Sequence, residues 1–133
     1  MGRFARRVYT VAGIYGLIVM LPQYFMEGRI GRDTPPPITH PEYFYGFIGV
    51  VVAWQIAFLV IARDPQRFRA LMPVTVLEKL VFAVPVLLLW AKGRVAASVL
   101  PFAALDLILG ALFLVSYFRT RGVLAAPEPA SVV

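Results

Sequence analysis

Residues 43–62 read YFYGFIGVVVAWQIAFLVIA, twenty consecutive residues without a charged side chain. An α-helix rises about 1.5 Å per residue, so a helix of this length matches the roughly 30 Å hydrocarbon core of a bilayer. The stretch therefore predicts a helix that spans a membrane.

Similar apolar runs lie on both sides of this stretch. The predicted spans are residues 8–25, 43–62, 70–91 and 95–118. Only 15% of the 133 residues are charged, whereas a soluble domain is about a quarter charged, so most of the chain must be solvated by lipid. We predict an all-α polytopic membrane protein, in which residues 1–121 form one antiparallel bundle of four transmembrane helices. Residues 122–133 are predicted to form a disordered C-terminal tail.

The longest connection, residues 27–42, joins the first two spans. Three consecutive prolines at positions 35–37 predict an extended polyproline stretch there. Thr39 and Glu42 have the spacing of a capping box, in which each side chain bonds the backbone of the other, so we expect Thr39 to cap the second helix.

Basic residues gather at the ends of the apolar runs and predict the orientation. Eight fall on one side of the membrane: Arg3, Arg6, Arg7, Arg63, Arg67, Arg69, Arg119 and Arg121. Four fall on the other side: Arg29, Arg32, Lys92 and Arg94. Since cytoplasmic loops carry the excess of lysine and arginine, both termini are predicted to be cytoplasmic. This topology accounts for the net charge of +6, and no nucleic-acid partner is expected.

The residue types present exclude several kinds of site. The chain has no cysteine, and its single histidine, His40, lies outside the apolar runs, so neither a haem nor another metal cofactor is expected. No phosphate-binding loop, dinucleotide fingerprint, serine elbow or zinc-protease motif occurs. Arginine outnumbers lysine eleven to two, which is typical of a GC-rich bacterial genome and indicates the inner (plasma) membrane.

Three ionisable residues lie inside the apolar runs: Glu78, Lys79 and Asp106. Each costs roughly 2.5–3.5 kcal/mol near the centre of a spanning helix, so each needs a partner or a function. Tyr15 and Gln55 fall at a similar depth on the other two helices. The five residues together predict an intramembrane polar network to which every span contributes.

Two interpretations of this network remain open. In the first, Lys79 pairs with Asp106 or Glu78, and Gln55 and Tyr15 cap the pair, which locks the helices together. In the second, the network forms a ligand pocket or a proton-handling site, in which Glu78 or Asp106 would be the acid or base of an enzyme and Lys79 would tune it. Ala103 and Gly110 flank Asp106 at helical spacing, and their small size leaves room for a neighbouring helix.

The second span also carries a face of small residues, at Gly46, Gly49, Ala53 and Ala57. Such a face lets helices approach closely. Gln55 points almost opposite to it, so this span has two contact faces or meets another chain. We therefore expect a homo-oligomer or a larger membrane complex through this face, in addition to contact with the lipid bilayer.

Residues 8–118 resemble in layout the DoxX-like small bacterial membrane proteins, which have four helices, short loops and a charged residue in a later span. The resemblance carries no motif over residue by residue. Our first functional hypothesis is a non-catalytic binding protein, either an accessory subunit of a membrane complex or a holder of a lipophilic ligand such as a quinone or lipid. The alternatives are an intramembrane enzyme acting on a lipophilic substrate and a small proton-coupled carrier.

Overall fold

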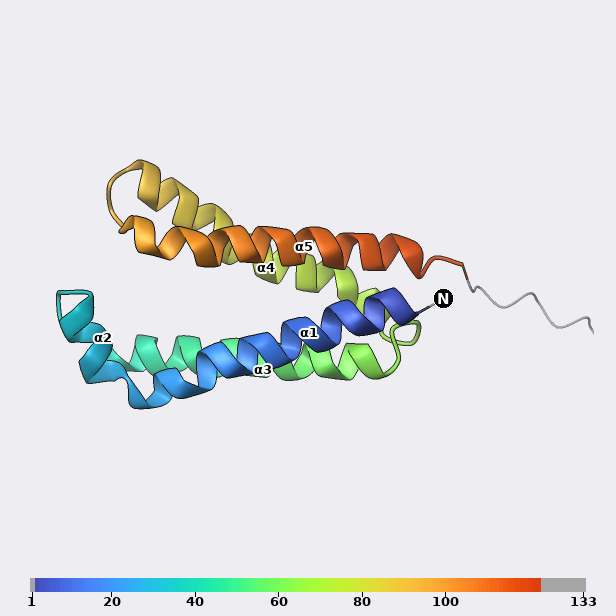
Figure 1. Cartoon of the computed structure of the whole chain (residues 1–133), viewed down its shortest axis with the longest axis horizontal. Helices are drawn as coiled ribbons and strands as arrows, with labels where there is room; N and C mark the ends of the chain where they lie inside the picture. Colours follow the sequence, from blue (N-terminus) through green and yellow to red (C-terminus); the bar gives the residue numbers. More distant parts are fainter. Residues whose placement is uncertain (1, 123–133) are drawn as a thin grey trace, which may run out of the picture.

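The computed structural model describes residues 2–122 and folds them into α-helices joined by short connections (Figure 1). The helices are α1 (Arg3–Met20), α2 (Glu27–Asp33), α3 (Pro41–Arg63), α4 (Met72–Ala91) and α5 (Leu100–Arg119). Short 3-10 turns extend three of them: η1 (Leu21–Phe25), η2 (Arg69–Leu71) and η3 (Ala97–Val99). Four of the resulting segments, each 23 residues long, are long and apolar enough to cross a membrane. The prediction of an all-α fold with four spans is confirmed; the predicted tail lies almost entirely outside the described residues.

The ends of the spanning helices follow from proline and glycine. Proline occupies the first turn of three of them, at Pro41, Pro73 and Pro101, where its missing N–H leaves no bond unmade. Gly93 ends α4 with φ +67, a left-handed conformation that favours glycine. Its N–H bonds the Trp90 carbonyl at 2.9 Å, and the N–H of Arg94 bonds the Leu89 carbonyl at 2.8 Å, which is a Schellman motif. This motif turns the chain back towards α5.

The connection between the first two spans differs from its prediction. It contains helix α2 and then bends at residues 34–36, so the predicted extended polyproline stretch is wrong. Arg29 and Asp33 form an i,i+4 ion pair at 3.4 Å along α2. Glu27 in the first turn and Arg32 in the last also complement the helix dipole. Local charge pairing therefore favours a short helix before the prolines.

The capping box is also wrong. His40, not Thr39, precedes the first residue of α3, and no side chain caps that end. Pro41 begins the helix and has no N–H to be bonded. The Glu42 carboxylate lies 3.3 Å from His40 Nδ1 instead.

The four spanning helices form two antiparallel hairpins, α1 with α3 and α4 with α5, which meet mainly through α1 and α5 (Figure 1). The start of α1, the α3–α4 connection and the end of α5 lie together at one end of the molecule, which we call the arginine-rich end. Helix α2 and the α4–α5 turn lie at the opposite end, the α2 end.

The buried core is shared by the two hairpins only in part. Near the arginine-rich end, one cluster draws on all four helices: Ala5, Tyr9, Ala12, Phe58, Ile61, Ala62, Met72, Leu109 and Phe113. Towards the α2 end, the buried cluster of Ala83, Val86 and Ala103 belongs to α4 and α5 alone. Figure 1 shows the hairpins diverging in that direction. The ring centroids of Phe47 and Phe82, 6.3 Å apart, still link α3 to α4 there.

Glycines hold α1 close against α3. A Cβ built on Gly13 would lie 2.9 Å from the Gln55 carbonyl oxygen, and one on Gly16 would overlap the Gln55 side chain. Only a residue without a side chain fits either position, because backbone and a buried side chain fill the space. This contact determines where Gln55 points.

Candidate functional site

Lys79 lies between two carboxylates inside the bundle. Its Nζ is 3.2 Å from Glu78 Oε2 on the same helix and 3.3 Å from Asp106 Oδ1 on α5. The side chains of Lys79, Glu78 and Asp106 are 6%, 13% and 18% exposed, respectively. The sequence predicted that Lys79 pairs with either Asp106 or Glu78; in the structure it contacts both. We call these three residues the charged cluster.

Small residues on α5 make this approach possible. A Cβ added to Gly110 would lie 3.4 Å from Cβ of Lys79, so the two helices are already in contact at that point. Ala103, one turn before Asp106, is fully buried against α4. The face of α5 that carries Asp106 therefore packs inside the protein, as its flanking residues predicted.

The charged cluster holds one ammonium and two carboxylates. Glu78 Oε2 is buried and has no hydrogen-bond partner among residues 2–122, so its contact with Lys79 is an ion pair without good hydrogen-bond geometry. With all three groups ionised, the cluster carries one excess negative charge. A charge left without a partner in a buried site is costly: removal of one member of a buried ion pair destabilises a protein by roughly 3–5 kcal/mol in measured cases. A further hydrogen-bond donor at the cluster would stabilise it.

The charged cluster lies at the boundary of the shared core. Lys79 Nζ is 5.2 Å from the ring centroid of Phe58, a member of that core, which is within cation–π range. Along α5, Asp106 falls between Ala103, in the cluster confined to one hairpin, and Leu109, in the shared core. The charges therefore occupy the level at which the two hairpins separate.

A second polar contact lies in the shared core, and the sequence analysis did not find it. The Tyr9 and Thr75 hydroxyl oxygens are 2.7 Å apart, and both residues are fully buried. Thr75 donates its single proton to the Met72 carbonyl at 2.7 Å, so Tyr9 is the donor to Thr75. The Tyr9 ring stacks on Phe113 with centroids 4.3 Å apart.

A sequence signal for Tyr9 exists. Tyr9, Ala12, Gly13 and Gly16 stand at i, i+3, i+4 and i+7, which puts them on one helical face. All four are buried in the structure. The small residues of this face could have identified Tyr9, rather than Tyr15, as the inward-facing tyrosine of the first span.

Tyr15 and Gln55 do not join the charged cluster. Gln55 is buried, but its amide nitrogen donates to the Val51 carbonyl of its own helix at 3.1 Å and its side chain packs on Gly16. The Tyr15 side chain is half-buried and forms no hydrogen bond within residues 2–122. Of the five predicted network residues, the structure brings together Glu78, Lys79 and Asp106, while Gln55 belongs to the α1–α3 interface.

The small-residue face of α3 lies partly against the rest of the protein and is partly exposed. A Cβ at Gly49 would lie 3.4 Å from the Tyr24 hydroxyl, and Ala57 is half-buried. Gly46 and Ala53 are exposed, and a Cβ at Gly46 would meet nothing within 4 Å. Two positions of this face, Gly46 and Ala53, are therefore open to lipid or to another chain.

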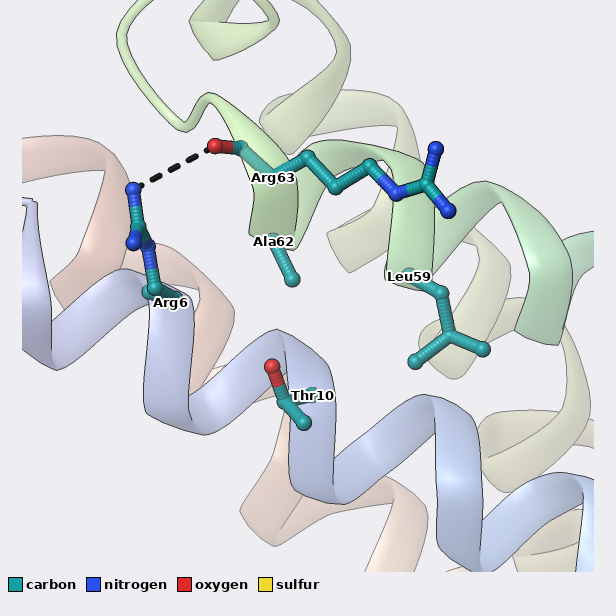
Figure 2. A pocket seen from close by; sticks show the side chains of 5 residues that line it. All are labelled: Arg6, Thr10, Leu59, Ala62 and Arg63. Carbon is teal, nitrogen blue, oxygen red and sulfur yellow. Dashed lines mark hydrogen bonds between the residues drawn. The ribbon is translucent and has the colours of Figure 1, made fainter.

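Two cavities occur at the ends of the described bundle, away from the charged cluster. One lies between α1 and α3 at the arginine-rich end, has a volume of about 330 Å³ and is lined by Arg6, Thr10, Leu59, Ala62 and Arg63 (Figure 2). The other, of about 370 Å³, lies beside α2 and is lined by Glu27, Gly28, Gly31, Arg32, Pro37 and Ile38.

Comparison with protein-family models, with curated proteins and with solved structures finds no match for this chain. The similarity to DoxX-like proteins accordingly stays a resemblance of layout. The charged cluster has to be interpreted from its own chemistry.

Proposed function

We propose that this chain acts by binding, and that it holds a lipophilic molecule whose polar end lies against the charged cluster. The supporting observation is the contact of Lys79 with both carboxylates at the level where the hairpins separate. Lys79 already contacts one oxygen of each carboxylate, and acid/base catalysis needs a group that is free to exchange protons with a substrate. Binding therefore fits this arrangement better than catalysis.

The chemistry of the cluster suggests the kind of ligand. Glu78 and Asp106 keep 13% and 18% of their side-chain surface exposed within apolar spans, where acyl chains offer no hydrogen bonds. A molecule with an apolar body and a hydroxyl or amine at one end would donate to these oxygens and offset the excess negative charge. A hydroxylated lipid has this combination, and so does a quinol, the reduced form of the expected quinone; the quinone itself has only acceptor carbonyls.

Extraction and mass spectrometry of the purified protein test the proposal. We expect a lipophilic compound to copurify with the natural chain and to fall at least roughly tenfold in Asp106→Asn, since a hydrogen bond to a charged group contributes about 1.5–3 kcal/mol. Asp33→Asn, the same chemical change on an exposed carboxylate of α2, should leave the amount unchanged. Equal amounts in all three proteins would contradict the proposal.

An intramembrane enzyme is the second candidate, because Glu78 Oε2 is buried without a hydrogen bond and so has a lone pair to offer. In that case Glu78 or Asp106 would be the acid or base, and Lys79 would tune it. Incubation of the copurified compound with the protein discriminates the two functions. An enzyme yields a new product that disappears in Glu78→Gln, whereas a binding protein returns the compound unaltered.

Assembly with other chains is compatible with either function. The exposed part of the small-residue face, at Gly46 and Ala53, offers a surface for a second copy or for a larger membrane complex in which this chain is an accessory subunit. A small proton-coupled carrier would need such an oligomer. Replacement of Gly46 by leucine should disrupt the assembly while leaving the hairpins folded.

We further propose that the protein lies in a bacterial inner membrane with both termini in the cytoplasm. Support comes from the excess of lysine and arginine, eight against four, at the end where the helix termini gather.

A further inference from the structure

The cavity at the arginine-rich end lies between the first turns of α1 and the last turns of α3 (Figure 2). Arg6 reaches from α1 to the Arg63 carbonyl, which its guanidinium bonds at 3.3 Å. The Thr10 oxygen points from α1 towards α3, and Leu59 and Ala62 supply an apolar wall. The Arg6 guanidinium and the Thr10 hydroxyl thus border a space that also has an apolar side, and the Arg63 side chain runs along its α3 edge, away from Arg6 (Figure 2).

The groups around this space favour an anion. An arginine carries five N–H donors in a fixed fork, and the described bond to Arg63 uses one of those on Arg6. That bond also occupies a carbonyl at the end of α3, an acceptor that would otherwise repel an anion. No carboxylate lines the cavity. The fork geometry of guanidinium matches the oxygens of phosphate, which it binds in pairs of hydrogen bonds.

We propose that this cavity is a site for the phosphate of an anionic membrane phospholipid, such as a phosphatidylglycerol. Arg6 binds the phosphate oxygens and Thr10 donates a further hydrogen bond. The exposed Arg63 side chain turns back from the α3 edge to add its guanidinium, and the first carbons of the lipid lie against Leu59. This site is separate from the charged cluster and does not depend on the function proposed for it.

Position and size support a lipid as the occupant. Arg6 is in the first turn of α1 and Arg63 is the last residue of α3, so both lie where a spanning helix meets the headgroups. The volume of about 330 Å³ is at the lower end of the usual range for ligand sites, about 300–1,000 Å³. It therefore accommodates a headgroup, while the acyl chains stay in the bilayer.

Native mass spectrometry of the full chain tests this site. The protein is exchanged into equal parts of phosphatidylglycerol, phosphatidylethanolamine and phosphatidylcholine with identical acyl chains, and the retained lipid is counted. We expect selective retention of phosphatidylglycerol, and roughly a tenfold loss of that selectivity in Arg6→Gln and in Arg63→Gln, which corresponds to about 1.4 kcal/mol. Arg7→Gln, which removes the same charge from the next residue outside the cavity, should retain the selectivity.

Three outcomes would overturn the proposal. Equal losses in the Arg6, Arg63 and Arg7 variants would mean that unspecific attraction accounts for the binding. Equal retention of the three lipids by the natural chain would mean that no anion site exists. Displacement of the lipid by millimolar glycerol phosphate would mean that a soluble phosphate, not a membrane lipid, is the ligand. Should Arg63→Gln fail to fold, Arg6→Gln together with Thr10→Val decides the matter.

Discussion

Replacement of Lys79 by methionine removes the ammonium that both carboxylates share and keeps much of the side chain's apolar volume. In the natural chain, Nζ lies 3.2 Å from Glu78 Oε2 and 3.3 Å from Asp106 Oδ1, with 6% of the lysine side chain exposed. The variant leaves two half-buried carboxylates, on neighbouring helices, without the cation between them. We therefore expect Lys79→Met to destabilise the α4–α5 hairpin.

The size of the effect follows from these distances. At an effective dielectric constant of about 20, each contact is an attraction of about 5 kcal/mol before desolvation. Desolvation of the charges offsets much of this attraction, and removal of one partner from buried pairs costs about 3–5 kcal/mol in measured cases. Since the two carboxylates are partly exposed, we expect the lower end, a loss of about 3 kcal/mol in the free energy of unfolding.

Unfolding in mixed detergent micelles, with increasing sodium dodecyl sulfate and far-ultraviolet circular dichroism as the signal, measures this loss. Because Lys79 contacts both acids, Lys79→Met with Asp106→Asn should recover only part of the stability. Adding Glu78→Gln, which leaves no charge in the cluster, should recover most of it.

An unchanged free energy of unfolding in Lys79→Met would refute this reasoning. It would mean that the ammonium extends to the headgroups in the membrane and that the carboxylates do not depend on it. Full recovery in the Lys79 and Asp106 double variant would instead show that the Glu78 contact contributes nothing.

Two further predictions concern packing and a third concerns the orientation in the membrane. Gly16→Ala should destabilise the protein by about 1–3 kcal/mol, because its Cβ overlaps Gln55, whereas Gly46→Ala, which meets nothing within 4 Å, should be neutral or up to about 1 kcal/mol stabilising in the same micelle titration. Tyr9→Phe should lower the free energy of unfolding by about 0.5–1.5 kcal/mol, because it loses the hydrogen bond to Thr75. The control Tyr43→Phe, at an exposed tyrosine, should leave it unchanged. Equal effects would contradict a structural role for the Tyr9 hydroxyl. Since the chain has no cysteine, single variants Arg3→Cys, Thr34→Cys and Arg121→Cys report topology: an external thiol reagent on intact cells should label only residue 34, and the reverse pattern would overturn the proposed orientation.

The spans could be predicted from sequence because length and hydropathy decide them. A run such as residues 43–62 has one solution in a bilayer, a helix whose backbone bonds are all internal. The meeting of Lys79 with Asp106 was also predictable, since a charge inside an apolar run needs a partner and few were present. The small residues beside Asp106 indicated the face on which they would meet.

The positions of the uncharged polar side chains were harder to predict from the sequence. Gln55 is satisfied by the Val51 carbonyl of its own helix, so its chemistry does not require a contact with the charged cluster. The rotation of α3 about its axis decides which neighbour it meets, and that rotation depends on Gly13 and Gly16 of α1. Thr75 likewise bonds its own helix, and its contact with Tyr9 arises only when all four helices pack.

The sequence did not predict that the two hairpins separate on the α2 side of the charged cluster. Buried and lipid-facing residues in a spanning helix are equally apolar, so the hydropathy that identifies the spans does not show where two helices part. The change from a four-helix core to the Ala83, Val86 and Ala103 cluster of one hairpin is visible only in the structure.

The central claim is that Lys79 is held between Glu78 and Asp106, and solid-state NMR in lipid bilayers tests it directly. In a Lys92→Arg variant, Lys79 is the only lysine of the chain, so a ¹⁵N label on lysine Nζ reports on it alone. The side-chain carboxyl carbons of aspartate and glutamate are labelled with ¹³C. Because Nζ lies 3.2 Å from a Glu78 oxygen and 3.3 Å from an Asp106 oxygen, we expect measurable dipolar couplings from this nitrogen to one carboxyl carbon of each residue type. Asp106→Asn and Glu78→Gln should each remove one coupling. A nitrogen coupled to neither carboxyl would contradict the account.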